Sequence, residues 1–211
     1  MNEQMTKLVA EPWKKSNYYD RAEQANAMDA FWRENSIFFQ LFKQLDLTHT
    51  VELACGHGRH VRRYVKNCET LSLVDIECEN IEFCKNRFRN IANIEYIVNS
   101  GVNFLPIVDE SKTAIFSYDA MVHFELHDID SYLRDAYRIL RPGGKILWHH
   151  SNYAANPGGV NLDNPGWRNF MSADIFAHLA ARAGFSMLAQ NVINWSKNSL
   201  DCISFYQKKP L

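Results

Sequence analysis

The sequence predicts an α/β fold: a doubly wound, mostly parallel sheet of seven strands that ends in an antiparallel hairpin, with an N-terminal helical cap. Between residues 50 and 183, short apolar runs alternate with segments at helical spacing, which is typical of right-handed βαβ units. After Gly184, two apolar runs are joined only by residues 196–199, a link too short for a helical crossover. These last two runs therefore form an antiparallel pair.

The cap is predicted from the first part of the chain. Apolar positions recur at helical spacing over residues 18–45, which indicates two helices. A length of 211 residues is close to the usual size of one domain, about 100–200 residues. We therefore expect a single domain over residues 1–211, with residues 1–46 as the cap and residues 47–211 as the sheet core.

The core contains the seven predicted strands and the helices between them. The strands are expected at residues 50–54, 71–75, 94–98, a run that ends with 119–122, 145–150, 187–195 and 200–206. The clearest helix places Ile129, Leu133 and Ala136 on one face. It is stopped by Pro142 and the two glycines that follow. We expect the last helix at residues 172–183.

Composition and charge exclude several classes of protein. Hydrophobic residues make up 46% of the chain and aromatic residues 13%, enough for a full core. The 23 basic and 24 acidic residues give a net charge of −1, which argues against a nucleic-acid partner bound through its phosphates. The five cysteines form no CxxC pair, and no apolar run approaches the ~18 residues of a membrane span. We therefore expect a cytoplasmic protein with reduced thiols and no membrane contact.

A glycine-containing turn follows the first predicted strand. Gly56 and Gly58 stand where glycine permits positive φ and lets a ligand approach the backbone. Asp75 comes 19 residues after Gly56, at the end of the second strand, where a carboxylate binds ribose hydroxyls. Val61 occupies the position of the third glycine in the dinucleotide-binding pattern, so that pattern is incomplete. A tight turn and a helix N-cap would explain these residues singly, but together they predict a ribose-containing ligand.

Four segments resemble the class I S-adenosylmethionine-dependent methyltransferases: residues 51–60, residues 72–88, the strand that contains Asp119, and residues 138–146. The resemblance covers residues 48–208 in matching order and spacing. It implies the same fold and S-adenosylmethionine as the cofactor. The positions that match the family's cofactor site are Glu52, Ala54, Gly56, Gly58, Asp75, Ile76, Ser100 and Gly101.

The resemblance also implies a role for each part of that site. The glycine turn passes beneath the methionine part of the cofactor, and Glu52 helps to hold its amino group. Asp75 binds the ribose, and the residue after it packs on adenine. Two positions depart from the family pattern. Ala54 replaces the first glycine, and Ser100 or Asn99 stands where the family has an aspartate near the adenine amino group.

Histidines gather at the predicted carboxyl ends of the strands. Methyl transfer requires an aligned acceptor, and a hydroxyl acceptor also needs a base near pH 7, a task that suits histidine. His123 follows the fourth strand and is the first candidate for the base, and Glu125 would orient it or bind a cationic substrate. His150, at the end of the fifth strand, is the second candidate. Since side chains alternate along a strand, His149 and His150 point to opposite faces, so at most one of them faces the ligand.

Two segments outside the sheet are candidates for the acceptor pocket. The expected acceptor-binding residues are Tyr18 and Tyr19 in the N-terminal segment, and Asn152, Tyr153 and Arg168 in the loop at residues 151–171. A loop of this length in a compact domain is more often functional than not. Arg168 is the cation of that loop and would pair with a substrate carboxylate or phosphate, or with a surface acid.

Three functions compete at this point. The leading one is methyl transfer to a hydroxyl or amine of a small molecule. The alternative is an RNA or protein methyltransferase, and the third is a cofactor-binding protein without catalysis. The residues after the fourth strand, His123 to Glu125, lack the Asn/Asp-Pro-Pro-Tyr/Phe pattern of many enzymes that methylate exocyclic or amide nitrogens. This argues against that subclass but not against ribose or protein targets. His123 and His127 have the spacing of helical metal ligands but straddle a strand end, so we expect no metal. A homodimer is possible from the sequence, because no sequence feature distinguishes a monomer from a dimer.

Overall fold

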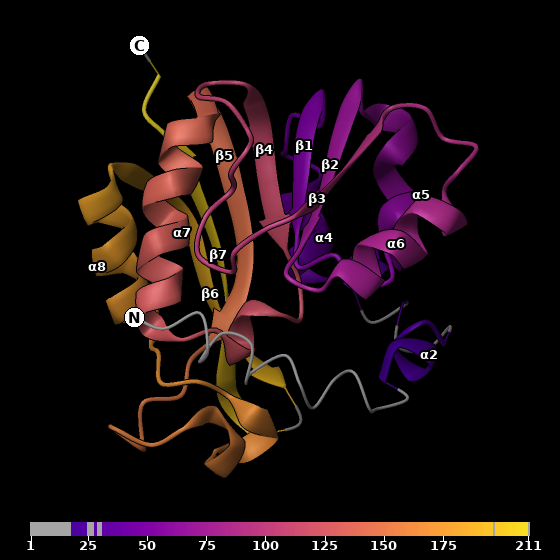
Figure 1. The fold of residues 1–211 in the computed structure, drawn as a ribbon. Helices are drawn as coiled ribbons and strands as arrows, with labels where there is room; N and C mark the ends of the chain where they lie inside the picture. The colour runs from indigo at the N-terminus through magenta and orange to yellow at the C-terminus, as the bar shows by residue number, and fades with distance from the viewer. Residues whose placement is uncertain (1–17, 25–27, 29–30, 196, 211) are drawn as a thin grey trace.

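The computed structural model describes residues 18–24, 28, 31–195 and 197–210. Part of the expected cap, residues 1–17, 25–27 and 29–30, lies outside the described residues. The strands are β1 (His49–Leu53), β2 (Thr70–Asp75), β3 (Ile94–Val98), β4 (Lys112–Ser117), β5 (Leu140–Ser151), β6 (Phe185–Trp195) and β7 (Lys197–Lys208). They form a sheet of seven strands in the order β3-β2-β1-β4-β5-β7-β6 (Figure 1).

Helices cover both faces of this sheet (Figure 1). One face carries α4 (Ile37–Phe42), α5 (Val61–Tyr64) and α6 (Cys78–Arg87), and the other carries α7 (Leu126–Ile139) and α8 (Ala173–Ala183). Each helix buries an apolar stripe: α4 buries Phe38 and Phe42, and α7 buries Ile129 and Leu133. The doubly wound architecture expected from the sequence is therefore confirmed. Among the described residues, every helix is too short or too polar to cross a lipid bilayer.

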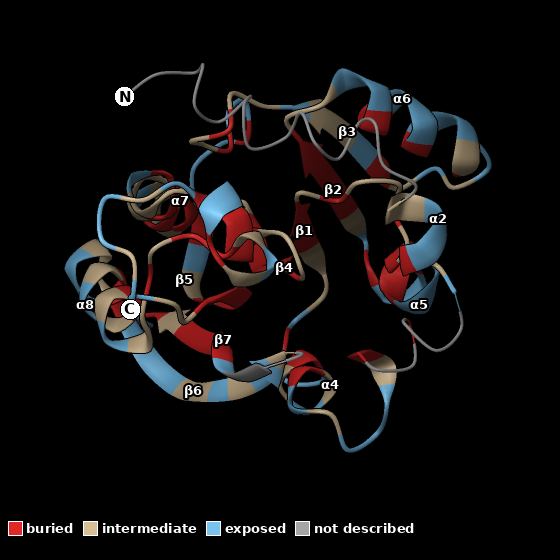
Figure 2. Cartoon of the chain, turned by 90° about the horizontal axis from the view of Figure 1, so that it is seen from below, coloured by how far each residue is buried: buried red, intermediate tan, exposed pale blue. Residues whose placement is uncertain are grey.

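The first five strands run parallel, and the last two complete the sheet as an antiparallel pair. β5 pairs antiparallel with β7, and β7 pairs antiparallel with β6. β7 therefore lies inside the sheet, and β6 forms its edge. Figure 2 shows the consequence, since β7 is largely buried whereas β6 is mostly exposed or half-buried. The predicted hairpin is confirmed, and its second strand is the one inserted between two others.

Several strand boundaries differ from those expected, and two of the differences alter the course of the chain. The sequence places the end of the fourth strand at residues 119–122, but β4 ends at Ser117. Asp119 has a φ of 59°, a left-handed conformation that turns the chain out of the sheet, and Met121–His123 form a 3-10 turn. In addition, α7 passes directly into β5 at Leu140, so the proline and glycines after it interrupt the pairing of β5 with β4 instead of forming a loop.

The carboxyl ends of β1, β2 and β4 meet at one edge of the sheet. β1 pairs with β2 on one side and with β4 on the other, so the order of the strands reverses at β1. In open α/β sheets the ligand crevice lies at such a switch point. The short helix α2 (Tyr18–Ala22) lies beyond this edge (Figure 1). The fold therefore brings the aromatic N-terminal segment against the ends of the central strands.

Candidate active site

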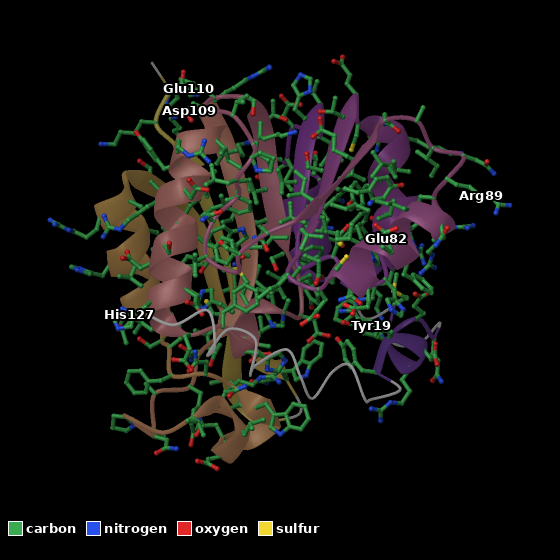
Figure 3. All side chains as sticks on the ribbon, in the orientation of Figure 1. Tyr19, Glu82, Arg89, Asp109, Glu110 and His127 are labelled. Carbon is green, nitrogen blue, oxygen red and sulfur yellow. The ribbon has the colours of Figure 1, made fainter. Side chains whose placement is uncertain are left out.

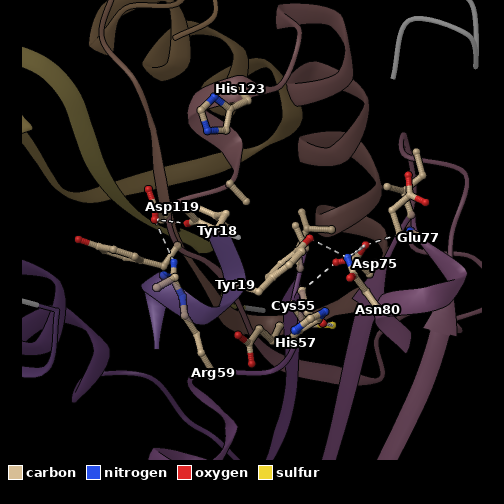
Figure 4. Close-up of a pocket in the computed structure, with 18 of the residues that line it drawn as sticks. Tyr18, Tyr19, Cys55, His57, Arg59, Asp75, Glu77, Asn80, Asp119 and His123 are labelled. Carbon is tan, nitrogen blue, oxygen red and sulfur yellow. Dashed lines mark hydrogen bonds and ion pairs between the residues drawn. The ribbon is translucent and has the colours of Figure 1, made fainter. Parts of the chain in front are cut away.

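A cavity of about 530 Å³ opens at the carboxyl ends of β1, β2 and β4. This volume lies in the usual range of ligand pockets, about 300–1,000 Å³. The residues expected from the sequence that line it are Tyr18, Tyr19, Glu52, Ala54, Gly56, Asp75, Ile76, Gly101 and His123. Figure 4 shows its side chains in two groups, one around Asp75 and one around Asp119, with His123 beyond the second group.

The turn after β1 allows close approach to its backbone. Ala54 and Gly56 have φ values of 56° and 53°, a left-handed conformation that glycine adopts freely and alanine at a cost. A Cβ on Gly56 would lie 2.7 Å from the ring of Tyr19, so glycine is required there. Gly58 lies behind the turn, where a Cβ would meet the ring of Phe88 at 2.6 Å. Gly58 therefore lets α6 pack against the turn and does not line the cavity.

Asp75 is held in a fixed orientation at the end of β2. Its Oδ2 accepts the backbone N–H of Gly56 at 2.8 Å. Its Oδ1 accepts the N–H of Glu77 at 2.9 Å and the side-chain amide of Asn80 at 3.1 Å. Burial raises the pKa of Asp75, while these hydrogen bonds favour the charged form and oppose that rise. The carboxylate that the sequence singles out therefore faces the glycine turn without rotational freedom.

Glu52 and the residues after β3 complete this half of the cavity. Glu52 is buried, and the hydroxyl of Tyr64 donates a hydrogen bond to its carboxyl group. Burial raises the pKa of Glu52 to about 7, so the carboxyl is partly protonated at neutral pH. After β3, Asn99 and Gly101 line the cavity, whereas Ser100 does not. Of the two residues that the sequence offers at that position, Asn99 is the one at the cavity wall.

An aromatic stack fixes α2 beside Asp75. The ring of Tyr19 stacks on His57 with centroids 4.0 Å apart, and His57 stacks on Phe83 of α6 at 3.9 Å. The amide of Asn80 donates to the hydroxyl of Tyr19 at 3.0 Å. Figure 3 shows Tyr19 at the edge where the central strands end. α2 is thereby joined both to the glycine turn and to the helix after β2.

A second cluster is centred on Asp119, just after β4. The hydroxyl of Tyr18 donates to its Oδ2 at 2.5 Å, and the guanidinium of Arg59 donates to the same atom at 3.0 Å (Figure 4). Burial and the nearby Asp119 carboxylate raise the pKa of Tyr18, so its hydroxyl stays protonated and acts as the donor. The backbone N–H of Asp119 donates to Nδ1 of His149 at 3.1 Å. Asp119 therefore joins α2, the turn after β1 and the interior of the sheet.

His123 lies in the 3-10 turn after β4 and contacts the loop at residues 151–171. Its Nδ1 is 2.8 Å from the carbonyl oxygen of Trp167. Because a carbonyl only accepts, Nδ1 carries the proton and Nε2 carries the lone pair of the neutral ring. Burial lowers the pKa of His123, which keeps the ring neutral near pH 7. His123 is therefore held in one tautomer, with Nε2 as the basic nitrogen.

Two residues that the sequence suggested for acid–base chemistry, His150 and Glu125, lie outside the cavity. His150 is fully buried on the other face of the sheet, where its ring stacks on Phe176 of α8. Its Nδ1 donates to the carbonyl of Ser151, and its Nε2 accepts from the hydroxyl of Ser204. Burial lowers its pKa to about 3. This placement gives His150 no route to an acceptor in the cavity, and Glu125 also lies outside it, at the N-cap of α7.

The expected acceptor residues of the loop also lie outside the cavity. The side-chain oxygen of Asn152 accepts the first N–H of α8 at 2.9 Å, and Tyr153 forms a bridge with Phe170. Arg168 is buried and makes a bidentate ion pair with Asp201 on β7, with distances of 2.8 and 2.6 Å. These contacts anchor the loop to the core. The cation of the loop turns inward because the sheet provides a buried carboxylate for it.

Arg59, Asn80 and Asp119 are among the polar residues of the cavity that sequence reasoning missed. Each of these residues comes shortly after a strand or turn that the sequence does reveal. A position just after a strand places a residue at the carboxyl end of the sheet, and this signal could have identified them. Their partners come from other segments, however. Asp119 and Arg59 are separated by 60 positions and meet only because β4 lies beside β1. That pairing cannot be read from either segment alone.

The described residues contain no group of three or more histidine, cysteine or acidic side chains that could hold a metal ion. His127 is exposed at the start of α7 (Figure 3), while His123 is buried in the wall of the cavity. The two histidines therefore do not form a common site, despite their spacing.

The residues of the cavity fit S-adenosylmethionine. Asp75 offers a fixed carboxylate for ribose hydroxyls, and Ile76 follows it. β2 pairs with β3 up to Asp75, so Asn99 and Gly101 lie beside Ile76 and add polar groups next to an apolar surface suited to a purine. Glu52 offers a carboxyl group for an amino group. The donor set therefore matches the parts of the cofactor that the sequence implies.

Residues 51–148 match the family model described as a methyltransferase domain. Among curated relatives, a fatty-acid O-methyltransferase from Mycolicibacterium smegmatis is 27% identical over 147 residues, which is 69% of this chain and 46% of that protein. A demethylmenaquinone methyltransferase from Tropheryma whipplei is 26% identical over 122 residues, 56% of this chain and 47% of that protein. The chain therefore spans about half the length of the curated relatives it matches.

Solved structures share the fold. A geranyl diphosphate C-methyltransferase from Streptomyces coelicolor aligns with a TM-score of 0.70 over 97% of both chains, at 11% identity. An S-adenosylmethionine-dependent methyltransferase from Aquifex aeolicus aligns with a TM-score of 0.66 over 90% of this chain and 96% of that chain, at 13% identity. Residues 51–148 therefore match a methyltransferase domain, and the chain has the fold of solved S-adenosylmethionine-dependent methyltransferases.

Proposed function

We propose that the chain transfers a methyl group from S-adenosylmethionine to a hydroxyl or amine of a small-molecule acceptor, with His123 as the general base. One observation carries the proposal. His123 lines the same cavity as Asp75 and the glycine turn, and its Nδ1 donates to the carbonyl of Trp167. This contact makes Nε2 the nitrogen that can take a proton.

Two further observations support a small-molecule acceptor. The curated relatives with related sequences include enzymes named for fatty acids and for demethylmenaquinone. The chain has a net charge of −1, which disfavours a polyanionic substrate. An RNA or protein acceptor stays the alternative. Transfer of labelled methyl to RNA or protein, with none to any small molecule, would reject the proposal in favour of that alternative.

The residues of the cavity divide the work of the reaction. When bound, S-adenosylmethionine supplies a methyl group that its sulfonium already activates. Asp75 binds and orients the ribose, which fixes the position of the methyl group. His123 Nε2 takes the proton from the acceptor as the acceptor attacks. Tyr18 and Tyr19 on α2 cover the cavity and exclude water.

The direction of the pKa shift fits this role. Burial lowers the pKa of His123, so the base is already unprotonated at neutral pH. As pH falls, the ring becomes protonated and the reaction slows. Because the shift is downward, this loss should occur below the usual histidine value of about 6.5.

The proposal is tested by replacing His123 with alanine. The substrates are a panel of phenols, alcohols and amines, assayed with methyl-labelled cofactor. His123→Ala should lower the rate about 10²- to 10⁴-fold, as the loss of a general base does. It should also abolish the rise of the rate with pH. His127→Ala, a change of the same kind at an exposed site, should leave both unchanged.

Binding of S-adenosylhomocysteine, measured by calorimetry, separates the possible outcomes. Affinity should be nearly the same in wild type and His123→Ala. If the variant keeps its rate and its pH profile, His123 is not the base. If the affinity collapses instead, His123 supports the cofactor site and the proposed role is wrong.

A further inference from the structure

Asp201 on β7 connects to both halves of the acceptor side of the cavity without lining the cavity itself. Its side chain is fully buried and makes three hydrogen bonds, two with Arg168 and one with His149. We propose that Asp201 is a positioning residue that holds His123 and Asp119 in place through these two partners. The proposal rests on the proposed role of His123, but its test does not depend on turnover.

The first connection runs through Arg168 to His123. Arg168 binds Asp201 with Nε and Nη2, and its Nη1 donates to the carbonyl of Gly166 at 2.8 Å. The guanidinium therefore holds the backbone on its N-terminal side as well as the sheet. Trp167 lies between these two anchors, and its carbonyl is the one that accepts Nδ1–H of His123.

Asn169, in the same short segment, is hydrogen-bonded to the residues on both sides of His123. The backbone N–H of Asn169 donates to the carbonyl of Val122 at 2.8 Å. The side-chain amide of Asn169 donates to the carbonyl of Phe124. The residues before and after His123 are thus bonded to the residue that follows Arg168. The position of the histidine therefore depends on the anchoring of this segment by Asp201.

The second connection runs through His149 to Asp119. The N–H of Asp119 donates to Nδ1 of His149, so Nδ1 is the acceptor and Nε2 carries the proton. Nε2–H in turn donates to Asp201 at 3.0 Å. Asp119 has a φ of 59°, which is unfavourable for a residue with a side chain. The hydrogen bond that Asp119 donates to His149 helps to hold this conformation, which aims the carboxylate at Tyr18 and Arg59 (Figure 4).

The charges of this cluster are balanced without solvent. Burial would raise the pKa of Asp201, but the hydrogen bonds from Arg168 and His149 together hold it below its usual value. One carboxylate thus serves two partners, one charged and one with a defined tautomer. Removal of the carboxylate should loosen both connections, whereas changes in one partner should loosen only one.

The test of the first connection is the tautomer of His123, read from long-range ¹H–¹⁵N NMR spectra. In wild type, Nδ1 should carry the proton. Arg168→Lys keeps the positive charge but loses the bidentate geometry and the contact with Gly166. It should shift His123 toward the Nε2–H tautomer that free imidazole side chains favour. Asp201→Asn should cause the same shift, and kcat should fall in both variants while KM changes little.

A matched control keeps the result specific. Glu95→Gln also replaces an acid that pairs with a cation, Lys112, but at the opposite edge of the sheet. It should leave the tautomer of His123 unchanged. If Arg168→Lys retains the near-ultraviolet circular dichroism of wild type and His123 stays in the Nδ1–H form, the proposal is wrong. Arg168→Lys decides the matter even if Asp201→Asn fails to fold.

The second connection is tested with His149→Phe, which preserves a ring to stack on Tyr118 but removes both hydrogen bonds. Affinity for S-adenosylhomocysteine should fall about tenfold, because Asp119 no longer holds Tyr18 and Arg59 firmly. The tautomer of His123 should not change. Equal affinity for S-adenosylhomocysteine in wild type and His149→Phe would contradict the proposed connection through His149. If His123→Ala keeps full turnover while the tautomer still responds to Arg168→Lys, the base assignment fails and the positioning by Asp201 stands.

Discussion

Asp75 is a buried carboxylate whose three hydrogen bonds all come from the protein's own turn and helix. Asp75→Asn keeps the shape of the side chain but replaces one acceptor oxygen with a donor. The variant should bind S-adenosylhomocysteine more weakly by about 1–3 kcal/mol, the scale of a lost hydrogen bond to a charged group. Calorimetry measures this directly.

The control for Asp75 is Asp109→Asn, which alters an exposed carboxylate in an ion pair with Arg138. It should not change the affinity. Unchanged affinity in Asp75→Asn would show that the carboxylate serves the turn and not the ligand. Tight binding of NADH together with no binding of S-adenosylhomocysteine would overturn the assignment of the cofactor site.

At the scale of elements, α2 depends on contacts at its two tyrosines. Tyr19 stacks on His57, and Tyr18 donates to Asp119. A helix of 5 residues has little stability of its own, so these contacts decide whether it stays on the cavity. We expect α2 to close over bound ligand and to open for its exchange.

Limited proteolysis near Tyr18 tests this motion. Saturating S-adenosylhomocysteine should slow cleavage of wild type. Tyr19→Ala loses the stack on His57, so its cleavage should be faster without ligand, and the ligand should protect it less. Tyr153→Ala, which removes a tyrosine outside the cavity, should behave as wild type. Cleavage rates that do not respond to ligand would exclude a lid role for α2.

At the scale of the whole molecule, buried histidines should make stability depend on pH. Burial holds the pKa of His150 at about 3 in the folded state, against about 6.5 in the unfolded chain. The unfolded state therefore binds a proton first as pH falls. The stabilisation from this neutral ring is fully present above about pH 6.5 and is lost as pH falls toward 3. Glu52, whose pKa is raised, acts in the opposite sense between pH 4.5 and about 7.

Comparison of two chains isolates the contribution of His150. The free energy of unfolding in urea is measured for wild type and His150→Gln from pH 7 to pH 4. Wild type should lose its advantage over the variant by up to about 1.4 kcal/mol per pH unit in this range. The exposed His127→Gln should track wild type throughout. A constant difference between wild type and His150→Gln would show that this ring does not stay neutral in the fold.

The sequence predicted the features that depend on local pattern. Alternating periodicities are enough to define a doubly wound sheet, and a four-residue link is enough to define the hairpin. Gly56 and Asp75 meet because they end neighbouring parallel strands, so their spacing in the chain carries the geometry. Strand alternation also placed His149 and His150 on opposite faces correctly, with rings stacked on Tyr118 and Phe176 respectively.

Other features depend on which strands become neighbours, and the sequence alone did not show them. Arg168 is the cation of a polar loop, and nothing near it in the chain reveals that it pairs with Asp201, 33 positions later. The role of Asp119 depends on a left-handed turn where the sequence suggested a continuing strand. Which of His149 and His150 points toward the ligand depends on what packs on each face of the sheet. The periodicity of the sequence does not carry this information.

The place of β7 in the sheet has a consequence for the order in which the protein can assemble. β7 follows every other described strand in the chain, yet it lies between β5 and β6 and carries Asp201. While the chain emerges during synthesis, Arg168 and His149 are made before their common carboxylate. Arg168 lacks its carboxylate partner, and His149 lacks the acceptor for its Nε2–H, until β7 enters the sheet. If Asp201 positions His123 as proposed, that positioning is completed only when β7 enters the sheet, after the strands that carry the glycine turn and Asp75 have been synthesised.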